Sequence, residues 1–74
     1  MINILIADDH AIIRRGLKEI LTDEFGARSY GEVENARGAL EQVRKRNWDL
    51  LILDIAMPGR SGLDVLKELK AARP

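Results

Sequence analysis

The sequence predicts an α/β fold in which strands and helices alternate along 74 residues. Two apolar runs, at residues 2–7 and 48–54, have the composition of strands buried on both faces of a parallel sheet. Segments with apolar residues at helical spacing follow the expected strands, and the connections between them are short. This alternation predicts three β-α units with right-handed crossovers and a parallel sheet flanked by helices.

Length and composition limit residues 1–74 to one small domain. Twelve basic and twelve acidic residues cancel, and no basic stripe is long enough for direct binding to nucleic acid. The chain has no cysteine, no apolar run near the roughly 20 residues of a membrane span, and no basic segment before its first apolar run. We therefore expect a cytoplasmic protein that binds neither nucleic acid nor membrane.

The first β-α unit consists of an expected strand at 2–7 and an expected helix at 11–21. In the strand "INILIA" only Asn3 is polar. Apolar side chains recur at helical spacing in the helix, and we expect them to be buried: Ile13, Leu17, Ile20 and Leu21. The opposite, solvated face is then expected to carry Arg14, Arg15, Lys18 and Glu19.

The second unit begins with "GARSYGEV", residues 26–33, where small or apolar residues alternate with longer ones. This alternation is typical of an edge strand, although two glycines and a serine weaken it. Asn35 is the expected N-cap of the next helix, which we expect to end at Asn47. Its buried stripe should be Ala36, Ala39, Leu40 and Val43, with basic residues in the last turn.

The third unit begins with the most apolar strand, "WDLLILD" at 48–54, whose start we expect Trp48 to cover by packing. After it, Met57, Pro58, Gly59 and Gly62 are expected to shape a loop that leaves Asp54 accessible. Residues 61–64, "SGLD", match a capping box at the start of a helix. The inner face of this helix should carry Leu63, Leu66, Leu69 and Ala72.

Carboxylates follow two of the expected strands: Asp8 and Asp9 after the first, and Asp54 at the end of the third. Ligands of parallel sheets bind beyond the carboxyl ends of the strands, so neighbouring strands would bring the three together. At about 4 Å each pair would cost roughly 1 kcal/mol in water. A hard divalent cation such as Mg²⁺ would offset this repulsion.

Each feature alone has an ordinary explanation, because an acidic pair is often a solvated helix cap and Asp54 could be a turn residue. The metal prediction therefore depends on the two together. No glycine-rich phosphate loop with a lysine precedes Asp54, which excludes a P-loop nucleotide hydrolase. His10, beside the acidic pair, is expected to be a polar surface residue rather than a second phosphate carrier.

The motifs "ILIADDHAIIRRGL" and "DLLILDIAMPGRSGLDVL" closely resemble the receiver domains of bacterial two-component response regulators. The opening "DDH" with "RRGL", together with "GEVEN", is similar to the subgroup with a helix-turn-helix DNA-binding output domain. The resemblance spans essentially the whole chain. It implies part of a flavodoxin-like, doubly wound sheet with strand order 2-1-3, and a signalling domain rather than an enzyme.

The resemblance also implies a role for each acidic residue. Asp54 matches the phosphoacceptor, a nucleophile that takes a phosphoryl group from a sensor histidine kinase. Asp9 matches the direct Mg²⁺ ligand, and Asp8 matches the acidic partner that acts through water. The backbone carbonyl of Ala56 matches the third protein ligand. In its full-length form, such a protein would control transcription.

A complete receiver has five β-α units, with a Thr or Ser after the fourth strand and a Lys after the fifth. Residues 1–74 provide only three units, so we expect the N-terminal part of a receiver, with the acceptor and metal ligands but without those two groups. The strand at 49–54 would then be an edge with unpaired backbone groups. The alternative function is a phosphorylation-independent module that self-associates through this strand.

Overall fold

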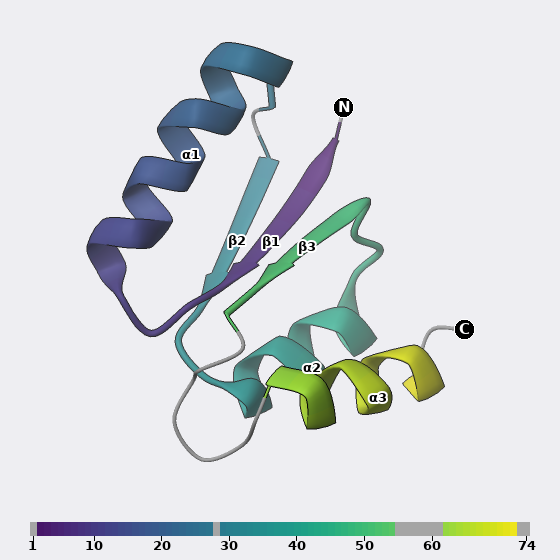
Figure 1. The fold of residues 1–74 in the computed structure, drawn as a ribbon. Helices are drawn as coiled ribbons and strands as arrows, with labels where there is room; N and C mark the ends of the chain where they lie inside the picture. The colour runs from purple at the N-terminus through teal and green to yellow at the C-terminus, as the bar shows by residue number, and fades with distance from the viewer. Residues whose placement is uncertain (1, 28, 55–61, 73–74) are drawn as a thin grey trace.

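The structure, a computed structural model, describes residues 2–27, 29–54 and 62–72. Its elements follow in the order β1 (Asn3–Ala7), α1 (Ala11–Phe25), β2 (Ser29–Val33), α2 (Ala36–Lys45), β3 (Leu50–Leu53) and α3 (Gly62–Ala72). The strands are parallel and ordered β2-β1-β3. Figure 1 shows α1 on one side of this sheet and α2 and α3 together on the other. The predicted fold class and strand order are therefore confirmed.

The central strand β1 is buried on both faces, as its composition predicts. Ile4 and Ile6 point toward α1, where they pack with Leu21. Leu5 and Ala7 point to the opposite face, toward α2 and α3. All four side chains are at most 1% exposed, because helices pack on both faces of β1 and paired strands flank it on both edges.

The helix α2 forms as predicted, with one difference at its end. The four alanine, leucine and valine positions predicted to be buried are buried. The Asn35 side chain accepts a hydrogen bond from the Gly38 N–H at 2.8 Å, which satisfies a free donor of the first turn. The helix ends at Lys45 with Arg46 as its C-cap, rather than at Asn47.

In α3 the predicted inner face is wrong at two positions. Val65 and Leu69, one turn apart, are the buried residues, whereas Leu63 and Leu66 are 66% and 40% exposed. The reason is that α3 packs against α2 and joins the core around Leu5, and the side that faces both carries Val65 and Leu69. Of the other predicted positions, Ser61 lies outside the described residues, and so does the side chain of Ala72.

The face that α1 turns to the sheet also differs from the prediction. Ile13 and Ile20 are about half exposed, at 47% and 58%, while the buried residues of this helix are Arg14 and Leu21. Arg14 is turned inward because it finds partners there, as described below. The helix also continues to Phe25, beyond the predicted end, and stops at Gly26, whose φ of 65° suits a residue without a side chain.

Trp48 has the packing role predicted for it. Its Nε1 donates a hydrogen bond to the Gln42 carbonyl at 2.9 Å, and the ring packs against the core on the α2 side of the sheet. The ring covers Gly31 so closely that a Cβ there would lie 2.5 Å from Trp48 Cη2. The glycine that weakens the β2 pattern is thus required by the tryptophan.

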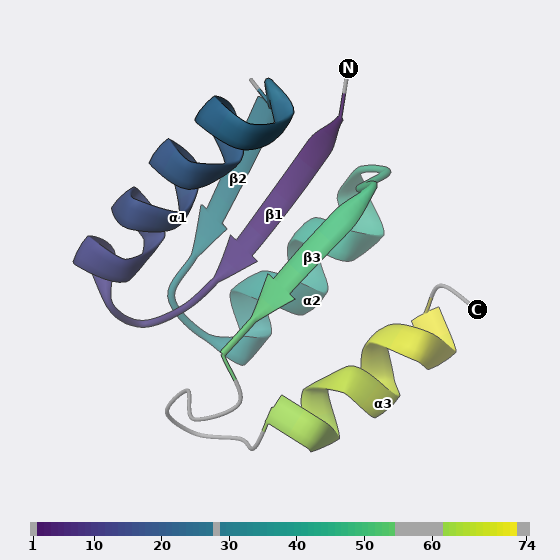
Figure 2. The same ribbon diagram turned by 45° about the horizontal axis from the view of Figure 1, so that its top comes forward.

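The strand β3 occupies one edge of the described sheet, opposite β2 (Figure 2). Among residues 2–27, 29–54 and 62–72 it pairs with β1 alone. Three of its side chains are half-buried, and that of Leu50 at its start is 44% exposed. Within those same ranges, no helix has the length and apolar character that crossing a membrane requires.

Candidate functional site

The carboxylates predicted to converge do so at the carboxyl ends of β1 and β3. The Asp8 N–H donates to the Val33 carbonyl at 3.1 Å, and the Asp54 N–H donates to the Ala7 carbonyl at 2.9 Å. These bonds continue the pairing on both sides of β1, and each aspartate is the residue that directly follows its strand. Ligand atoms of Asp8, Asp9, Asp54 and His10 all lie within 4.8 Å of one another.

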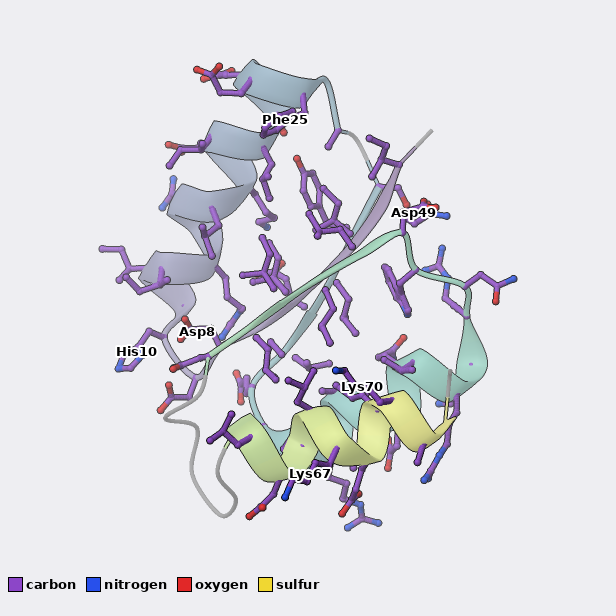
Figure 3. All side chains as sticks on the ribbon, turned by 45° about the vertical axis from the view of Figure 1, so that its right-hand side comes forward. Asp8, His10, Phe25, Asp49, Lys67 and Lys70 are labelled. Carbon is purple, nitrogen blue, oxygen red and sulfur yellow. The ribbon has the colours of Figure 1, made fainter. Side chains whose placement is uncertain are left out.

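The members of this acidic cluster differ in exposure. The Asp8 side chain is 13% exposed and that of Asp9 28%, while His10 reaches solvent at 64%. Asp54 is half-buried. In Figure 3, Asp8 and His10 lie at one end of the sheet and Asp49 at the opposite end. The site therefore has one largely buried carboxylate, that of Asp8, and more exposed groups that a ligand can reach from solvent.

His10 belongs to the cluster, which the sequence analysis missed. Its Nδ1 lies 3.0 Å from Asp8 Oδ1 and 2.9 Å from Asp9 Oδ1. The hydrogen bond to Asp8, followed by the negative charge of Asp9, raises the pKa of His10 above its ordinary value. The sequence position of His10 could have predicted its place in the cluster. A residue between a strand and the helix that follows it lies at the ligand-binding end of the sheet.

Arg14 is a second residue that sequence reasoning placed wrongly, on the solvated face of its helix. It is 8% exposed, and its Nη1 donates a short hydrogen bond of 2.6 Å to the Asp8 carbonyl. Its Nε donates to Glu32 Oε1 at 3.1 Å, so that α1 is tied to β2. The Asp8 backbone is thus held through its N–H by Val33 and through its carbonyl by Arg14.

Glu32 has two cationic partners, because Lys18 Nζ donates to its other oxygen at 2.9 Å. The hydrogen bond from Lys18 is the main reason that the pKa of Glu32 is lowered, and Arg14 contributes as well. This network occupies the side of the acidic cluster next to β2. Asp8 contributes only its carbonyl to Arg14 Nη1, and its carboxylate faces His10.

The loop predicted to follow Asp54 lies largely outside the described residues, including Ala56, Met57, Pro58 and Gly59. Gly62 is the first residue of α3. The roles of these residues and of the Ala56 carbonyl stay predictions. The described carboxylates nevertheless form a set of oxygen donors that suits a hard divalent cation, with enough exposure for water to complete its shell.

A parallel α/β sheet with an acidic cluster at its carboxyl edge is the arrangement of a receiver-type signalling domain. Residues 4–74 match the family described as the response regulator receiver domain. The match covers nearly the whole chain, so the chain belongs to this family of signalling, non-catalytic domains.

Several relatives share this fold and sequence pattern. The chain is 42% identical to the response regulator TrrA of Thermotoga maritima, solved in complex with Mg²⁺ and BeF, with a TM-score of 0.89 over 99% of this chain and 62% of that one. RcsB of Salmonella enterica, solved on the promoter rprA with the phosphomimetic BeF₃⁻, is 30% identical, with a TM-score of 0.87 over 100% of this chain and 63% of that chain.

Curated relatives are longer proteins. The chain is 31% identical to the response regulator GacA of Pseudomonas viridiflava over 100% of its own length but 35% of the relative. It is 35% identical to UvrY of Escherichia coli over 93% of this chain and 32% of that protein. The chain thus spans about a third of the length of these regulators.

Proposed function

We propose that this chain is the phosphoacceptor part of a response regulator and that Asp54 accepts a phosphoryl group from a sensor histidine kinase. The observation that carries the proposal is the position of Asp54, at the end of β3 and within 4.8 Å of the Asp8 and Asp9 ligand atoms. Further support comes from the relative TrrA, which was crystallised in complex with the histidine kinase ThkA.

In this proposal a carboxylate oxygen of Asp54 attacks the phosphorus of the kinase phosphohistidine. The new O–P bond forms as the N–P bond breaks, and the imidazole of the kinase leaves with the electron pair. Asp8, Asp9, Asp54 and the Ala56 carbonyl would hold Mg²⁺, whose charge would offset that of the phosphoryl oxygens. The residues of the chain hold the acceptor in line, which is the main task of a protein in phosphoryl transfer.

The output proposed for the full-length protein is control of transcription in the cytoplasm. RcsB, a relative of similar fold, was solved on a promoter, which supports this direction. Residues 1–74 have no net charge, so DNA contact would fall to another part of the protein. Residues 1–74 are proposed to be the N-terminal part of a receiver.

The proposal is tested with Mg²⁺ and a small phosphoryl donor, acetyl phosphate, which releases acetate as it transfers its phosphoryl group. Intact mass should increase by one phosphoryl group in the wild type and in Asp23→Asn, an exposed carboxylate on α1. It should not increase in Asp54→Asn. Labelling that persists in Asp54→Asn would place the acceptor elsewhere, and an unlabelled wild type would favour the alternative below.

The alternative is a module that self-associates without phosphorylation through strand 49–54. It is supported by the half-exposed Leu50 and by the fact that β3 pairs with β1 alone among the described residues. Sedimentation should then give a dimer that Leu50→Lys dissociates. A well-folded monomer at high micromolar concentration would exclude this alternative.

A further inference from the structure

We infer that His10 is a ligand of the cation bound at Asp8, Asp9 and Asp54, and that its imidazole shifts the site toward transition-metal ions such as Mn²⁺ and Co²⁺. The inference rests on the proposed function, since it requires that a divalent cation binds between these carboxylates. It adds a nitrogen donor to a site whose other donors are all oxygens.

The distances between His10 and its neighbours fit a common metal. In an octahedral shell with bonds of about 2.1 Å, adjacent ligand atoms lie about 3.0 Å apart and opposite ones about 4.2 Å apart. The His10 Nδ1 lies 3.0 Å from Asp8 Oδ1 and 2.9 Å from Asp9 Oδ1, as adjacent ligands do. The four donors spread over at most 4.8 Å, so small side-chain rotations would close the shell.

The backbone fixes the position of His10 relative to the carboxylates. Its N–H donates to Asp8 Oδ1 at 2.8 Å, so the residue cannot move away from Asp8 without losing a hydrogen bond. Arg14 holds Asp8 by donating to its backbone carbonyl, so that the Asp8 carboxylate oxygens are left for other partners. The ring is 64% exposed, so a hydrated ion can approach it from solvent.

The chemistry of the donors predicts the change in selectivity. Mg²⁺ prefers oxygen ligands and retains several waters, so an imidazole contributes little to its binding. Transition-metal ions accept imidazole readily, and their affinity for mixed nitrogen and oxygen sites increases from Mn²⁺ to Co²⁺. The His10 side chain should therefore strengthen Co²⁺ binding strongly, Mn²⁺ binding less, and Mg²⁺ binding least.

Calorimetric titration of the 74-residue chain with Mg²⁺, Mn²⁺ and Co²⁺ tests the inference, in buffer alkaline enough for a neutral imidazole. His10→Gln should weaken Co²⁺ binding by about 10- to 100-fold, the scale of losses in metal-site variants. Mg²⁺ binding should change by no more than about two-fold, because Mg²⁺ gains little from an imidazole. Asp54→Asn, in contrast, should weaken all three ions.

A second measurement uses the unaltered protein. His10 is the only histidine of the chain and there is no cysteine, so the imidazole ring signals in an NMR spectrum belong to this residue alone. Diamagnetic Zn²⁺ should shift the His10 ring nitrogen signals at one equivalent, and by much more than Mg²⁺ does, because only Zn²⁺ should bond directly to the ring nitrogen.

The outcomes separate this inference from the proposed function. An equal Co²⁺ to Mg²⁺ affinity ratio in the wild type and His10→Gln, with ring signals unmoved by Zn²⁺, would overturn the role of His10 and leave the carboxylate site intact. Failure of every cation to bind the folded wild type would overturn the metal site itself. If His10→Gln does not fold, the ring signals of the wild type decide the question.

Discussion

The two faces of the sheet hold their helices by different combinations of apolar and polar contacts. On the α2 and α3 face, the buried cluster is apolar and consists of Leu5, Ala36, Leu40, Val43, Val65 and Leu69. On the other face α1, described along its full length, buries two residues, the apolar Leu21 and the charged Arg14. Apolar side chains at this face and its margin stay exposed, including Ile20 at 58% and Phe25 at 68%.

This difference suggests that one face contributes mainly to the stability of the fold and the other to the position of the acidic cluster. Apolar burial stabilises in proportion to area and has no directional preference, so the α2 and α3 face should supply most of the folding free energy. Hydrogen bonds from a buried guanidinium are directional, and those of Arg14 end at the Asp8 carbonyl and at Glu32. The α1 face, which also packs Leu21 on Ile4 and Ile6, therefore fixes the position of Asp8, and the α2 and α3 face holds the larger apolar cluster.

The largest effect should come from removing apolar volume on the α2 and α3 face. Leu69→Ala deletes a side chain that is 5% exposed and should destabilise the protein by about 2–5 kcal/mol. Ile20→Ala, on α1 and largely solvated, should change stability by no more than about 0.5 kcal/mol. Urea denaturation followed by circular dichroism measures both, and equal losses would contradict the division between the faces.

A glycine on each side of the comparison should respond with opposite sign to the same substitution. In Gly31→Ala the new Cβ would lie 2.5 Å from Trp48 Cη2 and 3.1 Å from Leu5 Cδ1, so we expect a loss of about 1–3 kcal/mol. In Gly16→Ala, inside α1, the Cβ would meet nothing within 4 Å, and helix propensity should stabilise by about 0.5–1 kcal/mol.

Thermal unfolding of the two glycine variants gives the signs directly. The intrinsic fluorescence of Trp48, the only tryptophan, should change in Gly31→Ala and stay constant in Gly16→Ala. A stable Gly31→Ala with unchanged fluorescence would mean that the indole does not pack on this glycine.

The sequence was sufficient for the order and type of the elements and for the meeting of Asp8, Asp9 and Asp54. Strand and helix periodicity is local, and the strand order follows from a family resemblance carried by motifs. With both known, carboxylates at the ends of neighbouring parallel strands must lie at one edge. These conclusions needed no information about side-chain contacts.

The orientation of the helices was harder to predict. In α1 both Ile13 and Leu21 were candidates for the buried face, and hydropathy alone favours turning isoleucine inward. The choice depends instead on Arg14 meeting Glu32, a residue of another element that no local pattern reveals. The same limit explains Leu66 in α3 and the position of His10, since each depends on which partners are available after folding.

A smaller effect should follow from removing the polar attachment of α1. Arg14→Met keeps much of the side-chain volume but loses the hydrogen bonds to the Asp8 carbonyl and Glu32. We expect a loss of about 1–2 kcal/mol, since hydrogen bonds from charged groups contribute about 1.5–3 kcal/mol and water can partly replace the one at the partly exposed Glu32. Lys18→Met, which leaves Arg14 in place, is the matched control and should cost less.

Arg14→Met should also weaken Mg²⁺ binding, measured by calorimetry at a temperature where the variant is folded, because the Asp8 backbone would lose one of its two anchors. Lys18→Met should leave Mg²⁺ affinity unchanged. If both variants bind Mg²⁺ like the wild type, the α1 face does not position the site.

The smallest effect is a dependence of stability on pH that originates in Glu32. Its pKa is lowered in the folded protein, chiefly by the hydrogen bond from Lys18, with a contribution from Arg14. The stabilisation is therefore present above the pKa of the unfolded chain and is lost as the pH falls through the lower, folded pKa. Because the Glu32 side chain is 37% exposed, the contribution should be at most about 1 kcal/mol.

Urea denaturation over a series of acidic to neutral pH values isolates this contribution when the wild type is compared with Glu32→Gln. The amide oxygen of the variant would still accept a hydrogen bond from Arg14, but the side chain would carry no charge, so the difference in stability should be largest near neutral pH and vanish in acid. Added salt should reduce it, because the pair is partly solvated. A difference that is constant with pH would show that Glu32 holds α1 by hydrogen bonding alone, and that the charges of Arg14 and Lys18 add nothing to that attachment.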